Sequence, residues 1–212
     1  MQPAEQISDV MNIEAAKESQ KQQVKTSTPR HLPGVEGVWV FVFADMMVFA
    51  VMFGSFMADR QHNLALFEQS RQLLNPDVGG INTLILLTSS LFVVLAIDAL
   101  QRSRPKQPPI MLGLALACGL CFIVLKILEY KDKFDIGISI LSNDFFMYYF
   151  VMTGIHLGHV VVGCVVLVVL WFRSRSSTTG GESLTVYEGG AIYWHMVDLL
   201  WICLYPLLYL VR

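Results

Sequence analysis

Residues 145–172 read "FFMYYFVMTGIHLGHVVVGCVVLVVLWF", a stretch without Asp, Glu, Lys or Arg. About 20 consecutive apolar residues are enough for a helix to cross the hydrocarbon core of a bilayer, so a run of this length predicts a tilted transmembrane helix. Two histidines, His156 and His159, stand three residues apart inside it. The pair could bind a metal, move protons or fix the packing of the helix, and each role implies a different function.

Four further apolar runs surround this one, and short polar connections separate them. They span about residues 38–58, 80–100, 110–130 and 189–211. The whole chain is 54% hydrophobic and 15% charged, whereas an average soluble domain is about 45–50% apolar and about 25% charged. The sequence therefore predicts an all-α protein, a polytopic membrane bundle of five transmembrane helices.

Residues 1–35 differ from the rest, being rich in Gln, Lys, Glu and Ser and without an apolar stretch. They predict a polar, disordered cytoplasmic tail, followed by a transmembrane domain over residues 36–212. Lys and Arg are more frequent in this tail and in the second and fourth connections than on the opposite side. The positive-inside rule therefore predicts a cytoplasmic N-terminus and a periplasmic C-terminus. The net charge of −2 argues against nucleic-acid binding.

Ionisable residues inside membrane spans are costly and usually functional. Asp45 lies in the middle of the first span, either as a proton-exchanging or lipid-contacting group or as a neutral acid bonded to a neighbouring helix. Lys126 and Glu129 share one helical face at i,i+3. We expect them to form an ion pair at the water interface, with side chains that snorkel outward, and we expect the same environment for Asp98.

His156 and His159 also share one helical face. A metal site built on such a pair needs further ligands from other helices. The candidates inside the spans are Glu129, His195 and Asp198. His195 and Asp198 repeat the i,i+3 spacing, which fits either a ligand with its orienting carboxylate or a polar pair that satisfies itself.

Small residues surround the first histidine pair. Gly154 and Gly158 form a G-x-x-x-G pattern, and Gly163 follows it. This pattern is typical of close contact between membrane helices. It favours packing and hydrogen bonding over metal binding as the role of His156 and His159.

Five segments, in chain order, resemble subunit III of the haem–copper oxidase superfamily in its short five-helix bacterial form. They are "GVWVFVFADMMVFAVMF" (37–53), "INTLILLTSSLF" (81–92), "LKILEY" (125–130), "FVMTGIHLGHVVVG" (150–163) and "YEGGAIYWHMVDLLWICLYPLLYL" (187–210). The resemblance covers about residues 34–211, and the last two motifs are the most specific. It implies a multi-pass protein of the bacterial inner membrane.

In this family, subunit III carries no haem, copper or other metal and has no catalytic centre of its own. The resemblance implies that haem and copper, or non-haem iron, lie in a catalytic partner subunit, and that phospholipid binds in a cleft beside the first helices. The acid at the position of Asp45 is normally a glutamate linked to proton uptake and lipid, and Asp45 is one methylene shorter. The residues matched to proton-linked, lipid-linked or packing positions are Asp45, Glu129, His156, His159, Glu188, His195 and Asp198.

The polar tail and the segment "LKILEYKDKFDIGI" (125–138) resemble the NorE-like branch associated with nitric oxide reductase and denitrification. The expected function is that of an accessory subunit in oxidase or nitric oxide reductase electron transport. Only five histidines occur in the chain, and His31 and His62 lie outside the spans, so a haem–copper centre does not fit here. The alternatives are a stand-alone membrane metalloenzyme using His156, His159 and His195, and a small proton carrier centred on Asp45.

Overall fold

The computed structural model describes residues 36–102, 106–175 and 181–211. The tail predicted over residues 1–35 lies outside them. The described elements are α2 (Glu36–His62), α3 (Leu64–Arg71), α4 (Pro76–Gln101), α5 (Gln107–Asp135), α6 (Asp144–Arg175), α7 (Gly181–Tyr205) and the π-helix η1 (Pro206–Leu210). Five of the helices are long and apolar enough to cross a membrane, and the described residues contain no strand. The predicted all-α bundle of five spans is confirmed.

Local sequence signals set several helix ends. Asn75 caps α4, since its side chain accepts a hydrogen bond from the backbone N–H of Asp77 and Pro76 occupies the first helical turn, where no backbone donor is needed. Asn143 accepts in the same way from the N–H of Phe146 at the start of α6. Gly137 follows α5 with a φ of 82°, a conformation that glycine adopts without steric cost.

Two short elements do not follow from the apolar runs. The eight-residue α3 lies where only a polar connection was expected, and it buries Phe67 against Phe56 and Phe145. The last turn of the fifth span is a π-helix that begins at Pro206. Proline removes a backbone donor, which accounts for a change of hydrogen-bond pattern at this residue.

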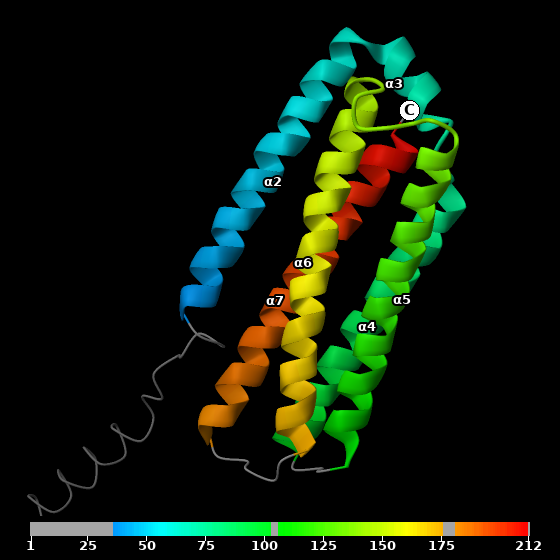
Figure 1. The fold of residues 1–212 in the computed structure, drawn as a ribbon. Helices are drawn as coiled ribbons and strands as arrows, with labels where there is room; N and C mark the ends of the chain where they lie inside the picture. Colours follow the sequence, from blue (N-terminus) through cyan, green and yellow to red (C-terminus); the bar gives the residue numbers. More distant parts are fainter. Residues whose placement is uncertain (1–35, 103–105, 176–180, 212) are drawn as a thin grey trace, which may run out of the picture. The chain divides into compact units, whose positions relative to one another are not determined.

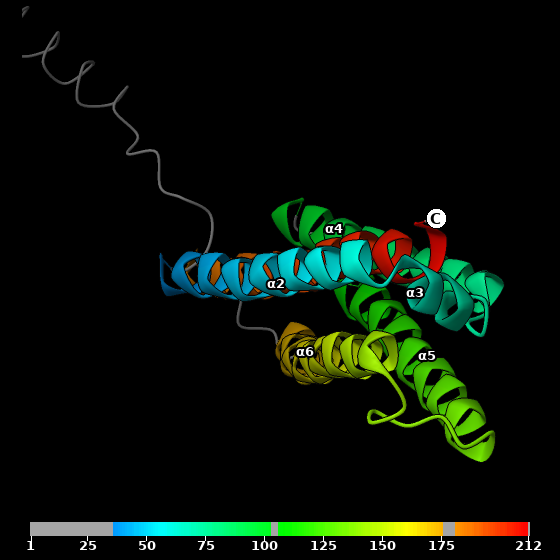
Figure 2. The same cartoon turned by 90° about the horizontal axis from the view of Figure 1, so that it is seen from above.

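Helix α7 lies at the centre of the described bundle, and α2 lies at its side. Half of the residues in the most apolar window of α7 are buried (50%), against 11% in that of α2. Figure 1 shows α2 diverging from α6 and α7 toward one end. From above, α2 runs along α7, while α4 lies on the opposite side of the bundle from α6 (Figure 2). The space beside α2 is therefore less filled than the space among the other four spans.

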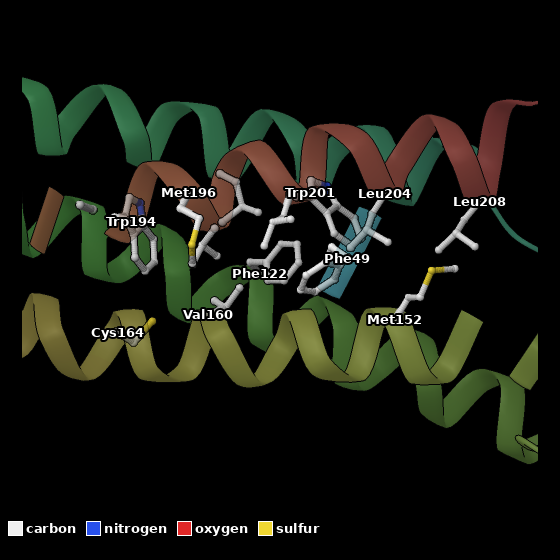
Figure 3. Packing of buried hydrophobic residues seen from close by; sticks show 14 of the residues in the cluster. Phe49, Phe122, Met152, Val160, Cys164, Trp194, Met196, Trp201, Leu204 and Leu208 are labelled. Atoms are coloured by element: carbon white, nitrogen blue, oxygen red, sulfur yellow. The ribbon is translucent and has the colours of Figure 1, made fainter. Parts of the chain in front are cut away.

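Aromatic side chains from α7 fill the core between the helices. Figure 3 shows Trp194 and Trp201 pointing from α7 toward α6, with Phe122 of α5 beside Trp201. Trp194 and Trp201 are fully buried, so they do not form an aromatic belt at the membrane surface. The six-membered ring of Trp194 occupies the space left by Gly119 on α5 and Gly163 on α6, where an added Cβ would approach it to 2.9 and 2.7 Å.

Candidate functional site

Lys126 forms the most deeply buried charged cluster of the described chain. Its side chain has no exposed surface, and its Nζ lies 2.9 Å from Oε2 of Glu129 and 2.8 Å from the hydroxyl of Tyr209. The hydroxyls of Tyr149 and Tyr209 both donate to Oε1 of Glu129. The ammonium is also 5.0 Å from the ring centre of Trp201, within the range of a cation–π interaction.

The predicted ion pair between Lys126 and Glu129 is confirmed, and the prediction that its ends reach water is wrong. Tyr149 on α6 and Tyr209 in η1 enclose the pair from two other elements, so both charged groups are satisfied inside the protein. Burial of an ion pair is tolerated when further hydrogen bonds use its remaining donors and acceptors. The cluster thereby ties three elements together.

Two further ion pairs lie near helix ends. Asp98 pairs with Arg102 at 2.9 Å near the end of α4, and both side chains are exposed, as expected for Asp98. In α3, Arg71 donates from two nitrogens to the carboxylate of Glu68 and from a third to the backbone carbonyl of Tyr209. The hydrogen bond from Arg71 lowers the pKa of Glu68, and the same bond raises the pKa of Arg71.

Asp45 is bonded to a neighbouring helix. Its Oδ1 lies 3.0 Å from Nε2 of His159 on α6, and both side chains are largely buried, at 11% and 17% exposed. The other ring nitrogen of His159 contacts the carbonyl of Ile155 at 2.8 Å. Bonding of Asp45 to a neighbouring helix was one of the two predicted alternatives, but its partner was not predicted from the sequence, because Asp45 and His159 are more than a hundred residues apart. It joins the loosely packed α2 to the bundle.

Replacing Asp45 with leucine is expected to loosen α2. The substitution removes the hydrogen bond to His159, and a bond of this kind contributes ~1 kcal/mol or more. Since about 1.4 kcal/mol corresponds to a factor of ten, we expect amide hydrogen exchange within α2 to accelerate at least about fivefold. Exchange measured by mass spectrometry on the purified chain tests this. The double variant Asp45→Leu with His159→Leu should be no looser than the single one, and Asp98→Leu is the control. Unchanged exchange in α2 would contradict the assignment.

His156 occupies a different environment from His159. Its side chain has no exposed surface and lies between aromatic rings, stacked on Trp201 at 5.2 Å and edge-on to Phe122 at 5.7 Å. Neither of its ring nitrogens has a hydrogen-bond partner among the described residues. The two histidines of the opening motif therefore face different neighbours, and their spacing does not bring them to a common ligand.

His195 bonds to α4 rather than to its neighbour on α7. Its Nδ1 is 2.7 Å from the hydroxyl of Ser90 and 3.9 Å from Oδ2 of Asp198. Asp198 is buried, and within the described chain neither of its carboxylate oxygens has a hydrogen-bond partner. Glu188 lies seven residues before His195 on the same face of α7 and is half-buried.

The described residues contain no group of three His, Cys, Asp or Glu side chains that could hold a metal ion. The metalloenzyme alternative needs His156, His159 and His195 to converge with Asp198 or Glu129. Instead, His156 lies in an aromatic stack, His159 pairs with Asp45 of α2, and His195 contacts Ser90. This donor set fits neither a haem–copper centre nor a zinc site, both of which need several ligands around one point.

The three glycines near the histidines do not act together. Gly163 contacts Trp194, but a Cβ added at Gly154 or Gly158 would meet nothing within 4 Å among the described residues. Nine residues separate Gly154 from Gly163, which places them on opposite faces of a helix with 3.6 residues per turn. Among the described residues, the close helix contact predicted from the three glycines therefore occurs at Gly163 and not at Gly154 or Gly158.

An apolar cavity of about 560 Å³ opens between α2, α6 and α7. Residues of all three helices line it, among them Phe41, Val166, Leu170, Gly190 and Tyr193. Tyr193 also donates a hydrogen bond to the backbone carbonyl of His159, so the cavity lies close to the pair between His159 and Asp45. A cavity of this size and lining fits an acyl chain better than a polar metabolite.

These features define a polytopic α-helical membrane protein in which Lys126, Glu129 and Asp45 are bonded within the bundle. The family profile of cytochrome c oxidase subunit III matches residues 17–211 of the chain. The chain therefore belongs to the cytochrome c oxidase subunit III family.

Curated relatives agree with this assignment. Cytochrome c oxidase subunit 3 of Alkalihalophilus pseudofirmus is 30% identical over 177 residues, which cover 82% of this chain and 84% of the relative. The protein of the same name in Bacillus subtilis is 26% identical over 175 residues, with the same two coverages. Cytochrome bo(3) ubiquinol oxidase subunit 3 of Buchnera aphidicola is 24% identical over 174 residues, covering 82% of this chain and 84% of the relative.

Proposed function

We propose that this chain is a non-catalytic subunit of a haem–copper oxidase, which stabilises the catalytic subunit in the membrane. Family membership supports the proposal, and so do relatives named as subunits of both cytochrome c and ubiquinol oxidases. The observation that carries it is the distribution of the intramembrane ionisable groups. These groups do not converge on one point. Lys126 lies in its buried cluster, Asp45 pairs with His159, and His195 contacts Ser90, and each of these contacts joins helices to one another. In this proposal haem and copper belong to the partner.

Lipid binding is the second part of the proposal. The cavity beside α2 is apolar, opens between membrane helices and has the size to accept acyl chains. Arg173 and Arg175 lie in the last turn of α6, the helix that contributes Leu170 to the cavity. Cations near the end of a span attract anionic lipid headgroups. A phospholipid with its chains beside α2 would fill the space that the helices leave.

Proton transfer through Asp45 is the third part. A carboxyl group and an imidazole in contact at 3.0 Å can pass a proton between them, and the pair spans the gap between α2 and α6. The carboxylate would support proton entry into the partner rather than carry protons alone. Liposomes containing the isolated chain should therefore show no proton flux, and a flux abolished by Asp45→Asn would favour the small-carrier alternative instead.

Two further assignments concern the setting. The excess of Lys and Arg on one side supports a cytoplasmic N-terminus and a periplasmic C-terminus, which cysteine labelling from either side of the membrane tests. The polar tail and the segment 125–138 resemble the NorE-like branch, so a nitric oxide reductase is a second candidate partner beside an oxidase. The identity of the co-purified catalytic subunit decides between oxygen and nitric oxide as the electron acceptor.

Native purification tests the main proposal. We expect the full chain, extracted in mild detergent, to co-purify with a polypeptide that shows a haem spectrum, and we expect the separated chain to hold less than a tenth of an equivalent of iron, copper or zinc. A full equivalent of metal on the separated chain, lost on changing His156 to alanine, would overturn the accessory role. His62→Ala is the control, because His62 ends α2 outside the buried clusters.

A further inference from the structure

His195 differs from the other ionisable side chains in the middle of the described spans. Its side chain is 38% exposed, whereas those of Asp45, Lys126, Glu129, His159 and Asp198 are all less than a fifth exposed. His195 lies eleven residues from the start of the span Leu184–Leu210, roughly 17 Å along the helix at 1.5 Å per residue. This is near the centre of a hydrocarbon core about 30 Å thick.

A ring nitrogen exposed at this depth needs a partner. Nδ1 of His195 already contacts the hydroxyl of Ser90, and Ser90 is itself only half-buried near the middle of α4. Among the described residues, Nε2 of His195 has no hydrogen bond. Exposing a polar group of this kind to hydrocarbon costs several kcal/mol in the absence of a bond. Phospholipid headgroups lie too far from the bilayer centre to supply one.

A carboxyl group lies next to this imidazole on the inner side of α7. Oδ2 of Asp198 is 3.9 Å from Nδ1 of His195, and the side chain of Asp198 is 5% exposed. Both oxygens of Asp198 are enclosed by the described chain, so the imidazole of His195, and not this carboxylate, presents a polar group on the outer face of α7.

The surroundings of this site are suited to helix packing. Leu199 and Ile202 follow His195 at i+4 and i+7 and are 47% and 44% exposed, and Leu91 next to Ser90 is 55% exposed. These exposed apolar side chains lie on α4 and α7 near the polar contact between His195 and Ser90. Membrane helices associate through such a combination of apolar packing and a hydrogen bond between side chains. In Figure 2, α4 lies on the opposite side of the bundle from α6.

We propose that the α4–α7 face around His195 and Ser90 is the docking surface for one transmembrane helix of the catalytic partner, which presents a hydrogen-bonding side chain to Nε2 of His195. This inference rests on the proposed function, because it takes the occupant from the same complex. The occupant is a protein helix because the position is too deep for a lipid headgroup. An acyl chain could cover the exposed apolar side chains but would leave Nε2 unbonded.

Site-specific photo-crosslinking in native membranes tests the docking face. A benzophenone side chain at Leu199 should crosslink to the haem-bearing polypeptide, identified by mass spectrometry and by its haem spectrum. The control position is Leu120, which is 51% exposed in the middle of α5. Crosslinks to the haem-bearing polypeptide from Leu120 alone, or crosslinks from Leu199 only to lipid or to a second copy of this chain, would overturn the assignment.

A substitution distinguishes docking from lipid exposure. Leucine in place of His195 suits a lipid-facing position but removes the proposed bond, so we expect retention of the haem-bearing polypeptide to fall about tenfold. The separated chain should stay folded, with its thermal stability lowered by no more than the loss of one hydrogen bond, that to Ser90. Leu120→Ala should leave retention unchanged. Full retention with His195→Leu overturns the docking face but leaves the accessory role intact. If the unmodified chain retains no haem-bearing polypeptide, the proposed function fails and this inference fails with it.

Discussion

Replacing Lys126 with methionine is expected to destabilise the chain by about 3–5 kcal/mol, the cost typical of removing one partner from a buried ion pair. Methionine keeps most of the side-chain volume, so packing is little changed. The carboxylate of Glu129 would keep the two tyrosine hydroxyls as donors but would lose its cation in a fully enclosed site. Equilibrium unfolding in mixed detergent, followed by tryptophan fluorescence, measures the free energy of unfolding.

Two control variants separate this effect from loss of any charge. The double variant Lys126→Met with Glu129→Gln should recover at least half of the loss, because neither buried charge remains. Arg102→Ala removes the cation of an exposed pair and should cost less than about 1 kcal/mol. If Lys126→Met costs no more than Arg102→Ala, the buried cluster does not stabilise the bundle as the geometry indicates.

Alanine at Gly163 is expected to cost about 1–3 kcal/mol, the range for overpacking a well-filled core. The new Cβ would lie 2.7 Å from two ring carbons of Trp194, and Trp194 cannot withdraw because it is fully buried between three helices. The same unfolding measurement tests it.

Gly158 provides the matched control for this prediction. It belongs to the same helix and five residues separate it from Gly163, but an added Cβ meets nothing within 4 Å in the described chain. Alanine there should stabilise the separated chain by about 0.5–1 kcal/mol, because glycine is the weaker helix former. Equal destabilisation by the two substitutions would contradict the contact between Gly163 and Trp194.

The positions of the five spans follow from the sequence because apolar length alone defines them. The fourth span is an example, since residues 145–172 predict it and α6 covers Asp144–Arg175. Helix α3 does not follow from the sequence, because eight residues with mixed polarity carry little signal. Its stability comes from the contacts of Phe67 with Phe56 and Phe145, which exist only once α2 and α6 are in place.

The candidate site also has a part that the sequence predicts and a part that only the folded structure shows. The i,i+3 spacing of Lys126 and Glu129 predicts their pairing, because both residues lie on one helix. Their burial depends on Tyr149 and Tyr209, which come from two other elements, and no local pattern marks either tyrosine as a partner. Contacts between residues of one helix can be predicted from their spacing in the sequence. Contacts between helices depend on the rotation of each helix about its axis and on its depth in the membrane, which the spacing does not give.

The histidine motif is the clearest case. Its spacing places His156 and His159 on one face, but a face about 60° wide can contact two different neighbours. One ring lies on Trp201 and the other reaches Asp45. The glycine pattern is equally ambiguous, because small residues permit a close contact without stating which of them makes it. Of Gly154, Gly158 and Gly163, only Gly163 makes such a contact in the described chain.

The position of Trp194 has a consequence for how related sequences can differ. One indole ring fills the space above both Gly119 and Gly163, so these two positions on different helices share a neighbour, beside the sulfur of Cys164 that also lies against Gly119. A relative with a larger residue at either glycine position needs a smaller residue at the position of Trp194. Positions 119, 163 and 194 should therefore covary as a triplet across the family, with substitutions at the two glycine positions each depending on the size of residue 194.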